Sequence, residues 1–113
     1  MLKQMDVAWF AGLFEGEGCV EYYVDKRNPN TGYVRIQIES TDKDIVDRLV
    51  EIWGGKIWFN TSPSKPKHHK PSWRWYISNK KEVKYIIEKM YPYLGQRRRQ
   101  RCDEVLERIT IAE

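Results

Sequence analysis

Residues 10–18 read Phe-Ala-Gly-Leu-Phe-Glu-Gly-Glu-Gly, and this stretch decides how the chain folds. With residues 7–9 it forms an unbroken apolar run that ends in two carboxylates set between glycines. The run is too short to cross a membrane, so it predicts a helix buried in protein, with Asp6 as its N-cap. Gly16 and Gly18 are expected to end the helix and to let the chain turn.

One side of this helix carries only small residues, because Ala8, Gly12 and Gly16 follow one another at intervals of four. Glycine inside a helix costs about 1 kcal/mol relative to alanine. A second helix that approaches closely along this small side would offset that cost. The spacing therefore predicts a helix–helix contact over Gly12.

Glu15 and Glu17 stand at the C-terminal end of the helix, where the dipole and the unpaired carbonyl groups are negative. A cation is therefore expected nearby. Carboxylate and carbonyl oxygens suit a hard divalent ion, and Mg²⁺ commonly combines one or two carboxylates with phosphate oxygens of a substrate. Isolated glutamates of this kind are more often simply solvated, but the small side and the flanking glycines favour a metal site.

Residues 9–19 resemble the signature helix of the LAGLIDADG homing endonucleases. Phe10 stands where that motif begins, Glu15 at its first acid and Glu17 at its last. The resemblance implies that two such helices pack at the centre of the protein and deliver their last acids to the scissile phosphates of DNA. It also implies that Glu17 binds Mg²⁺, with the carbonyl of Gly16 as a second ligand, and that Mn²⁺ or Ca²⁺ substitutes in binding.

The chain has 113 residues, which is enough for one domain with one core, placed here at residues 1–113. The signature occurs once and no internal repeat is visible, so the partner helix must come from a second copy of the chain. This predicts a two-fold homodimer. The residues expected at its interface are Ala8, Gly12, Glu15 and Gly16.

The net charge of +4 and the pI near 9.1 are compatible with a polyanionic partner, although a solvated surface explains them equally well. No apolar segment reaches transmembrane length and no secretory signal is visible. We therefore expect an intracellular protein, in the cytoplasm, at the nucleoid or in an organelle, with no membrane partner. Cys19, Cys102, His68 and His69 match no metal-ligand spacing, which argues against zinc.

Strands and helices are expected in a simple order along the chain. Alternation of apolar and polar residues predicts strands at residues 19–25, 33–40, 56–60 and 73–78, with a turn at residues 28–32 between the first two. Helices are predicted at residues 45–53, at residues 83–90 and from Gln96 onward, with caps at Ser40 or Thr41 and at Asn79. The class is α+β, and the order α-β-β-α-β-β-α plus a C-terminal helix is that of the family, whose four antiparallel strands form a saddle.

Such a sheet, backed by helices, leaves one face open, and in the family this concave face lies in the DNA major groove. A hydrated face would also be polar, but a mixture of Arg, Gln, Tyr and Trp favours base recognition. The strand residues assigned to DNA binding are Glu21, Tyr23, Asp25, Arg27, Tyr33, Arg35, Gln37, Lys56, Trp58, Asn60, Arg74 and Tyr76. The basic loop at residues 61–72 is expected to add contacts to phosphates or to a groove from Lys65, Lys67, His68, His69 and Lys70.

The densest positive cluster, residues 96–101, resembles the family segment that brings a basic residue into the active site. The best register places Arg97 at this position, where the family usually has lysine. Arginine cannot shuttle a proton near neutral pH, so the role implied for Arg97 is electrostatic. Where many relatives have glutamine near the attacking water, this chain has Ser40, which completes the residues assigned to catalysis with Glu17.

These features predict a site-specific endonuclease that hydrolyses both strands of DNA with Mg²⁺, each subunit cutting one strand. The resemblance further implies a long, nearly palindromic target and short 3′ overhangs. Two alternatives stay open. One is a catalytically silent DNA-binding protein on the same scaffold, which Ser40 and Arg97 favour slightly, and the other is a maturase that assists intron RNA splicing.

Overall fold

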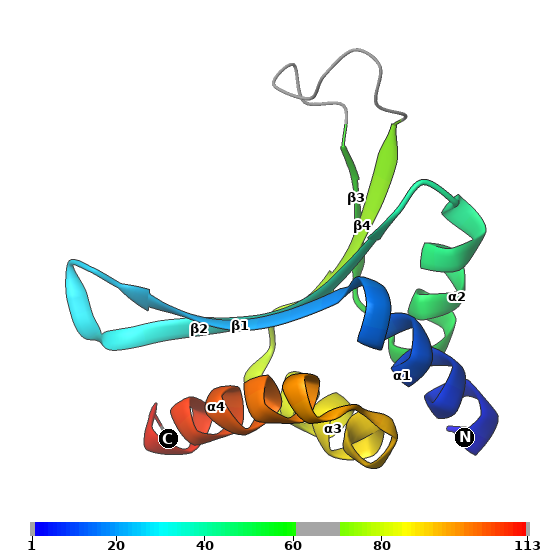
Figure 1. Ribbon diagram of the computed structural model, residues 1–113. Helices are drawn as coiled ribbons and strands as arrows, with labels where there is room; N and C mark the ends of the chain where they lie inside the picture. Colours follow the sequence, from blue (N-terminus) through cyan, green and yellow to red (C-terminus); the bar gives the residue numbers. More distant parts are fainter. Residues whose placement is uncertain (1, 61–70, 113) are drawn as a thin grey trace.

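The structure is a computed structural model that describes residues 2–60 and 71–112 (Figure 1). Its elements are, in order, α1 (Gln4–Glu17), β1 (Gly18–Asp25), β2 (Asn28–Ser40), α2 (Lys43–Trp53), β3 (Lys56–Asn60), β4 (Ser72–Ile77), α3 (Lys80–Met90), the short 3₁₀ helix η1 (Tyr91–Tyr93) and α4 (Gln96–Ala112). The predicted α+β class and the order α-β-β-α-β-β-α with a further helix are confirmed.

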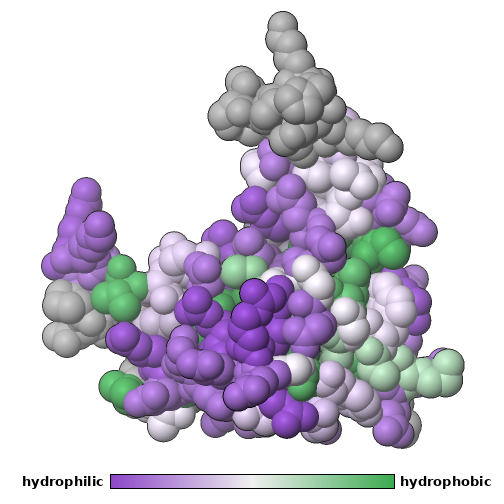
Figure 2. Space-filling model, in the orientation of Figure 1, coloured by the Kyte–Doolittle hydropathy of each residue, from purple (hydrophilic) through white to green (hydrophobic). Residues whose placement is uncertain are grey.

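The four strands form one antiparallel sheet in the order β1-β2-β4-β3. The helices α1 to α4 all lie on one side of this sheet, which leaves its other face open (Figure 1). The β1–β2 hairpin and the β3–β4 hairpin extend in different directions and form two arms (Figure 1). The space-filling view shows the hollow between these arms (Figure 2). The open face is therefore concave, as the predicted saddle requires.

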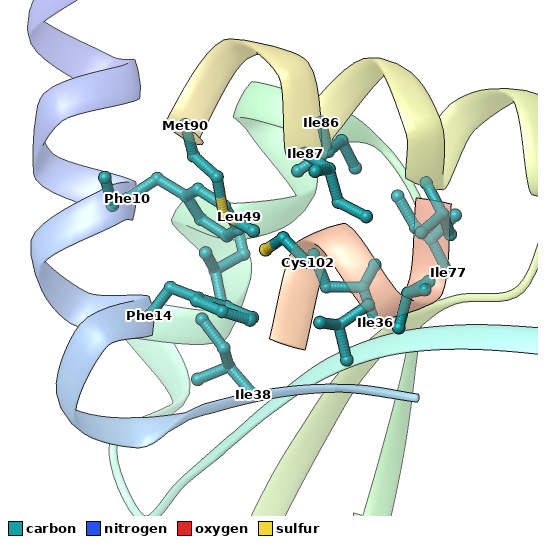
Figure 3. Packing of buried hydrophobic residues seen from close by; sticks show 14 of the residues in the cluster. Phe10, Phe14, Ile36, Ile38, Leu49, Ile77, Ile86, Ile87, Met90 and Cys102 are labelled. Carbon is teal, nitrogen blue, oxygen red and sulfur yellow. The ribbon is translucent and has the colours of Figure 1, made fainter. Parts of the chain in front are cut away.

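The core lies between the helices and the covered face of the sheet (Figure 3). Phe10 of α1 is fully buried, and its ring meets those of Trp53 and Trp75 edge-on, with centroids 5.3 and 5.7 Å apart. Cys102 of α4 lies in the same cluster as Phe10 and Phe14 (Figure 3). The alternating strand residues that close the core are Val20, Val34, Ile36, Ile38, Trp75 and Ile77.

Both ends of α1 have distinct local causes. The helix starts earlier than predicted, so Lys3 rather than Asp6 occupies the N-cap position, and Asp6 lies in the first turn, where its charge suits the helix dipole. At the other end the chain passes directly into β1 through Gly18, which is extended with φ −86°. A Cβ on Gly18 would overlap the ring of Phe14, so this sharp transition requires glycine.

The connection between β1 and β2 is tighter than the sequence suggested. The chain reverses after Asp25, whose Oδ1 accepts a hydrogen bond from the backbone N–H of Arg27 (2.9 Å), and β2 already begins at Asn28. The predicted turn at residues 28–32 is therefore wrong. The pairing register instead shifts between Val24 and Asp25, so the Pro- and Gly-containing segment marks an irregularity within the strand pair.

The helix α2 begins after Asp42, so neither Ser40 nor Thr41 is its N-cap residue. The hydroxyl of Ser40 instead accepts a hydrogen bond from the backbone N–H of Asp42 (3.0 Å) and fixes the turn before the helix. As predicted, two glycines follow the helix. Gly54 and Gly55 have φ values of +77° and +97°, which only glycine adopts readily.

The remaining elements agree closely with expectation. β3 covers the predicted residues 56–60, and β4 covers residues 72–77. Asn79 caps α3, because its Oδ1 accepts a hydrogen bond from the backbone N–H of Glu82 (3.0 Å). Within the described ranges, no helix has both the length and the apolar character needed to span a bilayer.

Candidate active site and nucleic-acid interface

The small side of α1 lies open. Ala8, Gly12 and Gly16 are all exposed, and a Cβ built on Gly12 or Gly16 would meet nothing within 4 Å. Met5, which precedes them on the same side, is 82% exposed. The predicted contact strip is therefore accessible along its length, and no part of the described chain covers it.

Glu17 is the last residue of α1, and its side chain is exposed beside the open strip. Gly16, whose carbonyl is the second predicted metal ligand, is exposed next to it. Among residues 2–60 and 71–112, no group of three His, Cys, Asp or Glu side chains could hold a metal ion. One chain thus offers a single carboxylate at this point, which fits a divalent ion only if a second copy and a substrate phosphate supply further oxygens.

Glu15 has a different environment from Glu17. Its carboxylate accepts a hydrogen bond from the backbone N–H of Gly95, immediately before α4. Its backbone carbonyl accepts a hydrogen bond from Nε of Arg98 (3.1 Å), which also lies 3.8 Å from its Oε2. A negative helix end and a positive helix start therefore meet, and Glu15 and Arg98 join α1 to α4.

Arg98 was not singled out in the sequence, although it belongs to the predicted basic cluster. Arg97, the predicted catalytic residue, is exposed, and it lines a surface pocket of about 320 Å³ together with Arg98, Gln100, Arg101 and Glu104. The pocket is lined by residues from the first turns of α4, and Arg98 among them contacts the end of α1. The catalytic assignment of Arg97 stays a prediction, and so does that of Ser40, whose hydroxyl is engaged with Asp42.

The strand register places the predicted residues within the paired parts of the strands on one face, while Asp25 lies beyond the register shift and Arg27 lies in the turn between β1 and β2. Glu21 pairs with Arg35 and Tyr23 with Tyr33, while Gln37 pairs with Tyr76. Two further cross-strand pairs on the same face join β4 to β3, namely Tyr76 with Lys56 and Arg74 with Trp58. The same alternation adds three residues to this face, namely Cys19, Glu39 and the buried Ser72. Each is in phase with its assigned neighbours, so the pattern itself could have identified them.

Aromatic rings and arginines pair repeatedly on this open face. The rings of Tyr23 and Tyr33 stack with centroids 4.8 Å apart. The guanidinium carbon of Arg35 lies 5.3 Å from the ring centroid of Tyr76. Burial raises the pKa of the Tyr23 hydroxyl, and the carboxylate of Glu21 raises it further. The face therefore combines fixed aromatic surfaces with cationic groups that can approach a nucleic acid.

Cys19 lies near the junction of α1, the sheet and α4. Burial raises the pKa of its thiol, and so does Glu21, whereas the charges of Arg98 and Arg101 act in the opposite direction. These arginines therefore reach the electrostatic neighbourhood of the first residues of β1. The predicted contacts of Lys65, Lys67, His68, His69 and Lys70 lie outside the described residues and stay predictions.

The fold is similar to that of solved endonuclease structures. The homing endonuclease I-CvuI, in complex with the I-CreI target, matches with a TM-score of 0.74 and 22% identity over 95% of this chain and 67% of that chain. The homing endonuclease I-TnaI matches with a TM-score of 0.66 and 19% identity over 96% and 72% of the two chains. The LAGLIDADG meganuclease I-AabMI, bound to uncleaved DNA, matches with a TM-score of 0.72 and 17% identity over 93% of this chain and 36% of that chain.

At such identities these structures establish the fold alone, and no curated protein matches the chain. Membership of a family is established by a match to a family model. The model described as LAGLIDADG endonuclease matches residues 10–100, from Phe10 in α1 into the first turn of α4. This span includes α1 from Phe10 onward, the whole sheet and the basic cluster up to Gln100, and it covers most of the 113 residues. The chain belongs to the LAGLIDADG endonuclease family.

Proposed function

We propose that this protein is a homodimeric, site-specific DNA endonuclease that requires a divalent metal ion, with Mg²⁺ as the natural one. The observation that carries the proposal is the position of Glu17. An exposed carboxylate ends α1 next to an uncovered strip of small residues, so pairing two strips would bring two such carboxylates together.

The open strip supports the homodimer on physical grounds. α1 is apolar on nearly all sides, and a helix of this kind is normally buried all round. Ala8, Gly12 and Gly16 leave room for the backbone of a second α1, and a two-fold axis would place the same residues on both sides of the contact. Glu15 would then lie beside the interface, with its carboxylate already bound to α4.

Glu17 and the carbonyl of Gly16 are the groups that would hold the metal ion. When bound, a divalent ion acts as a Lewis acid toward the attacking water and the leaving oxygen. The chain's own residues do the rest. Arg98 and Glu15 hold the end of α1 in place, and Arg97 adds positive charge where negative charge develops on the phosphate.

DNA would bind in the concave open face, with the aromatic and charged residues of all four strands in the major groove. This substrate agrees with I-CvuI, whose structure was determined with its own target in the presence of 2 mM Ca. I-CvuI was also determined with the I-CreI target in the presence of 2 mM Mg, with the DNA not cleaved. A two-fold dimer would recognise a long, nearly palindromic site, and a protein that acts on such a site would work inside the cell.

Selection of cleaved sequences from a randomised DNA library in Mg²⁺ tests this function. We expect enrichment of one nearly palindromic site with short 3′ overhangs. The Glu17→Gln variant should bind that site with unchanged affinity and cut it at least about a hundredfold more slowly, because the metal loses its carboxylate. Glu51→Gln, an exposed change on α2, should cut normally and serves as the matched control.

Three outcomes would each overturn a part of the proposal. Binding of one site without cleavage by the unaltered protein would establish a silent DNA-binding protein, the alternative that the engaged Ser40 hydroxyl favours. Full cleavage by Glu17→Gln would refute the role of Glu17. Sedimentation analysis decides the assembly separately, since a monomer at micromolar concentration, with and without DNA, would exclude the dimer.

A further inference from the structure

Glu39, Arg74 and Trp58 form a row across the open face of the sheet. Their backbones are direct register partners, because Glu39 of β2 faces Arg74 of β4, which in turn faces Trp58 of β3. Oε1 of Glu39 accepts hydrogen bonds from Nε (3.3 Å) and Nη2 (3.1 Å) of Arg74. The guanidinium carbon of Arg74 lies 5.2 Å from the ring centroid of Trp58. A carboxylate and an aromatic ring thus restrain the same guanidinium group.

Glu39 is itself held from a second point. Its Oε2 accepts a hydrogen bond from the hydroxyl of Ser72 (2.8 Å), and Ser72 is only 2% exposed. One oxygen of the carboxylate therefore binds a buried hydroxyl and the other binds the arginine. This chain of contacts fixes the plane of the Arg74 guanidinium before any ligand arrives.

Stability does not account for this arrangement. The side chains of Arg74 and Glu39 are 30% and 38% exposed, and ion pairs with such access to water add little to the free energy of unfolding. Fixing a long side chain also costs conformational entropy. What the row provides is orientation, which is useful when a planar guanidinium must meet a planar partner.

The donors that remain on Arg74 indicate that partner. Arginine has five N–H donors, and Glu39 takes the edge formed by Nε and Nη2. The Nη1/Nη2 end of the group remains for a ligand. Guanine presents two acceptors, O6 and N7, at its major-groove edge, and arginine binds both at once. The fixed fork matches guanine better than any other base.

We propose that Glu39 is a positioning residue for Arg74, and that Arg74 reads a guanine in the major groove with the free end of its guanidinium. The inference rests on the proposed function and adds a specific base contact to it. Because the protein would be a two-fold dimer, the same guanine should be required at one position in each half of the target.

Arg35 provides a contrast on the same face. It also stacks on an aromatic ring, that of Tyr76, at 5.3 Å. Its Nε is buried, however, and has no hydrogen-bond partner in the part of the chain that the structure describes. Stacking alone therefore leaves an arginine without the lateral support that Glu39 gives to Arg74, and Arg35 should contribute less to the choice of base.

The test is the base preference of the unaltered dimer and its variants, measured position by position by binding selection from a randomised library. Arg74→Ala should lower the preference for guanine at one position per half-site by about 5- to 150-fold, the range for one bidentate contact. Glu39→Ala should weaken the same two positions by about tenfold, and the double variant should show little further loss. Glu39→Gln, which keeps one oxygen acceptor, should lie between.

Two controls separate this role from a general effect on folding. Asp47→Ala breaks an exposed ion pair with Lys43 on α2 and should leave every position unchanged. Arg35→Ala should affect other positions. An equal loss at all positions in Glu39→Ala, or an unchanged guanine preference, would overturn the inference while the proposed function stands. A protein that selects no sequence at all would overturn both.

Discussion

The two long sides of α1 meet different surroundings. On one side Val7, Phe10, Ala11 and Phe14 are at most 5% exposed, and the last three belong to the core that α1 shares with the sheet and the other helices. On the other side Ala8, Gly12 and Gly16 are exposed. The amino acids of both sides are apolar, so composition alone does not distinguish them. Side-chain size does, because the large residues face their own chain, whereas the small ones are exposed and would admit a second backbone in the proposed dimer.

This difference separates folding from assembly within one helix. Changes on the packed side should lower the stability of each chain at any concentration. Changes on the open side should alter the association of two chains and leave the single chain intact. Substitutions on the two sides should therefore differ in whether their effect depends on protein concentration.

Phe10→Ala should have the largest effect on stability. The ring is fully buried between Trp53, Trp75 and Phe14, so its removal leaves a cavity and should cost about 3–5 kcal/mol of unfolding free energy. Urea denaturation measures this. Met5→Ala on the open side is the control, and at a protein concentration low enough for the chain to be monomeric it should change stability by less than about 0.5 kcal/mol. Equal losses in the two variants would contradict the comparison.

Cys102 of α4 belongs to the core that the packed side of α1 contacts, and its thiol makes the burial of this core testable by pH. Burial raises the pKa of its thiol to about 11 from an ordinary value of 9.0, so the folded state disfavours the thiolate. The free energy of unfolding is therefore unaffected by this thiol below pH 9. It falls by roughly 2–3 kcal/mol as the pH rises toward 11, because only the unfolded chain ionises readily. The free energy of unfolding, measured by denaturation at several pH values between 8 and 11, should fall less with pH for Cys102→Ala than for the unaltered protein. An identical pH dependence in both proteins would show that the thiol is not buried.

Gly18→Ala should cost about 1–3 kcal/mol, because its Cβ would overlap the Phe14 ring and force the packed side apart. The loss belongs to the single chain. Thermal unfolding should therefore show the same decrease at low and at high protein concentration. A loss that appeared only at high concentration would place Gly18 in the interface instead.

Gly12→Ala should change the stability of the single chain least, and it should raise that stability where the other substitutions lower it. A Cβ at Gly12 meets nothing within 4 Å, so alanine should stabilise the isolated helix by up to about 1 kcal/mol. In the proposed dimer the added methyl group would separate the two backbones, and the dissociation constant should rise about 5- to 150-fold. Sedimentation measures the dissociation constant, and unfolding at two protein concentrations measures the stability of the single chain. Tighter association would exclude the close approach.

Much of the fold could be read from the sequence, since its periodic patterns were strong. The strand at residues 56–60 was delimited by the glycines before it, and Asn79 carried an unambiguous capping signal. The turn at residues 28–32 was misplaced because proline and glycine mark both chain reversals and irregular strand pairing. Asp6 lies in the first turn and not at the predicted N-cap, and since aspartate suits both positions, the sequence alone does not distinguish them.

The site was less accessible to such reasoning. Four of the residues from 97 to 101 are arginines, and helical spacing alone does not say which of them turns toward another helix. The structure brings Arg98 to Glu15. The position of Glu39 followed from alternation, but its bond to Arg74 depends on how β2 and β4 are aligned, which local sequence does not encode.

Buried and outward-facing residues alternate along β2. Residues 34, 36 and 38 hold the fold together, while residues 35, 37 and 39 face outward between them. In the proposed endonuclease, a mutation at any of the latter three should alter the recognised site with little penalty in stability, so that new specificities would arise by ordinary point mutation. Deleting a single residue in this strand would instead invert both sets at once, and neither recognition nor folding should survive it.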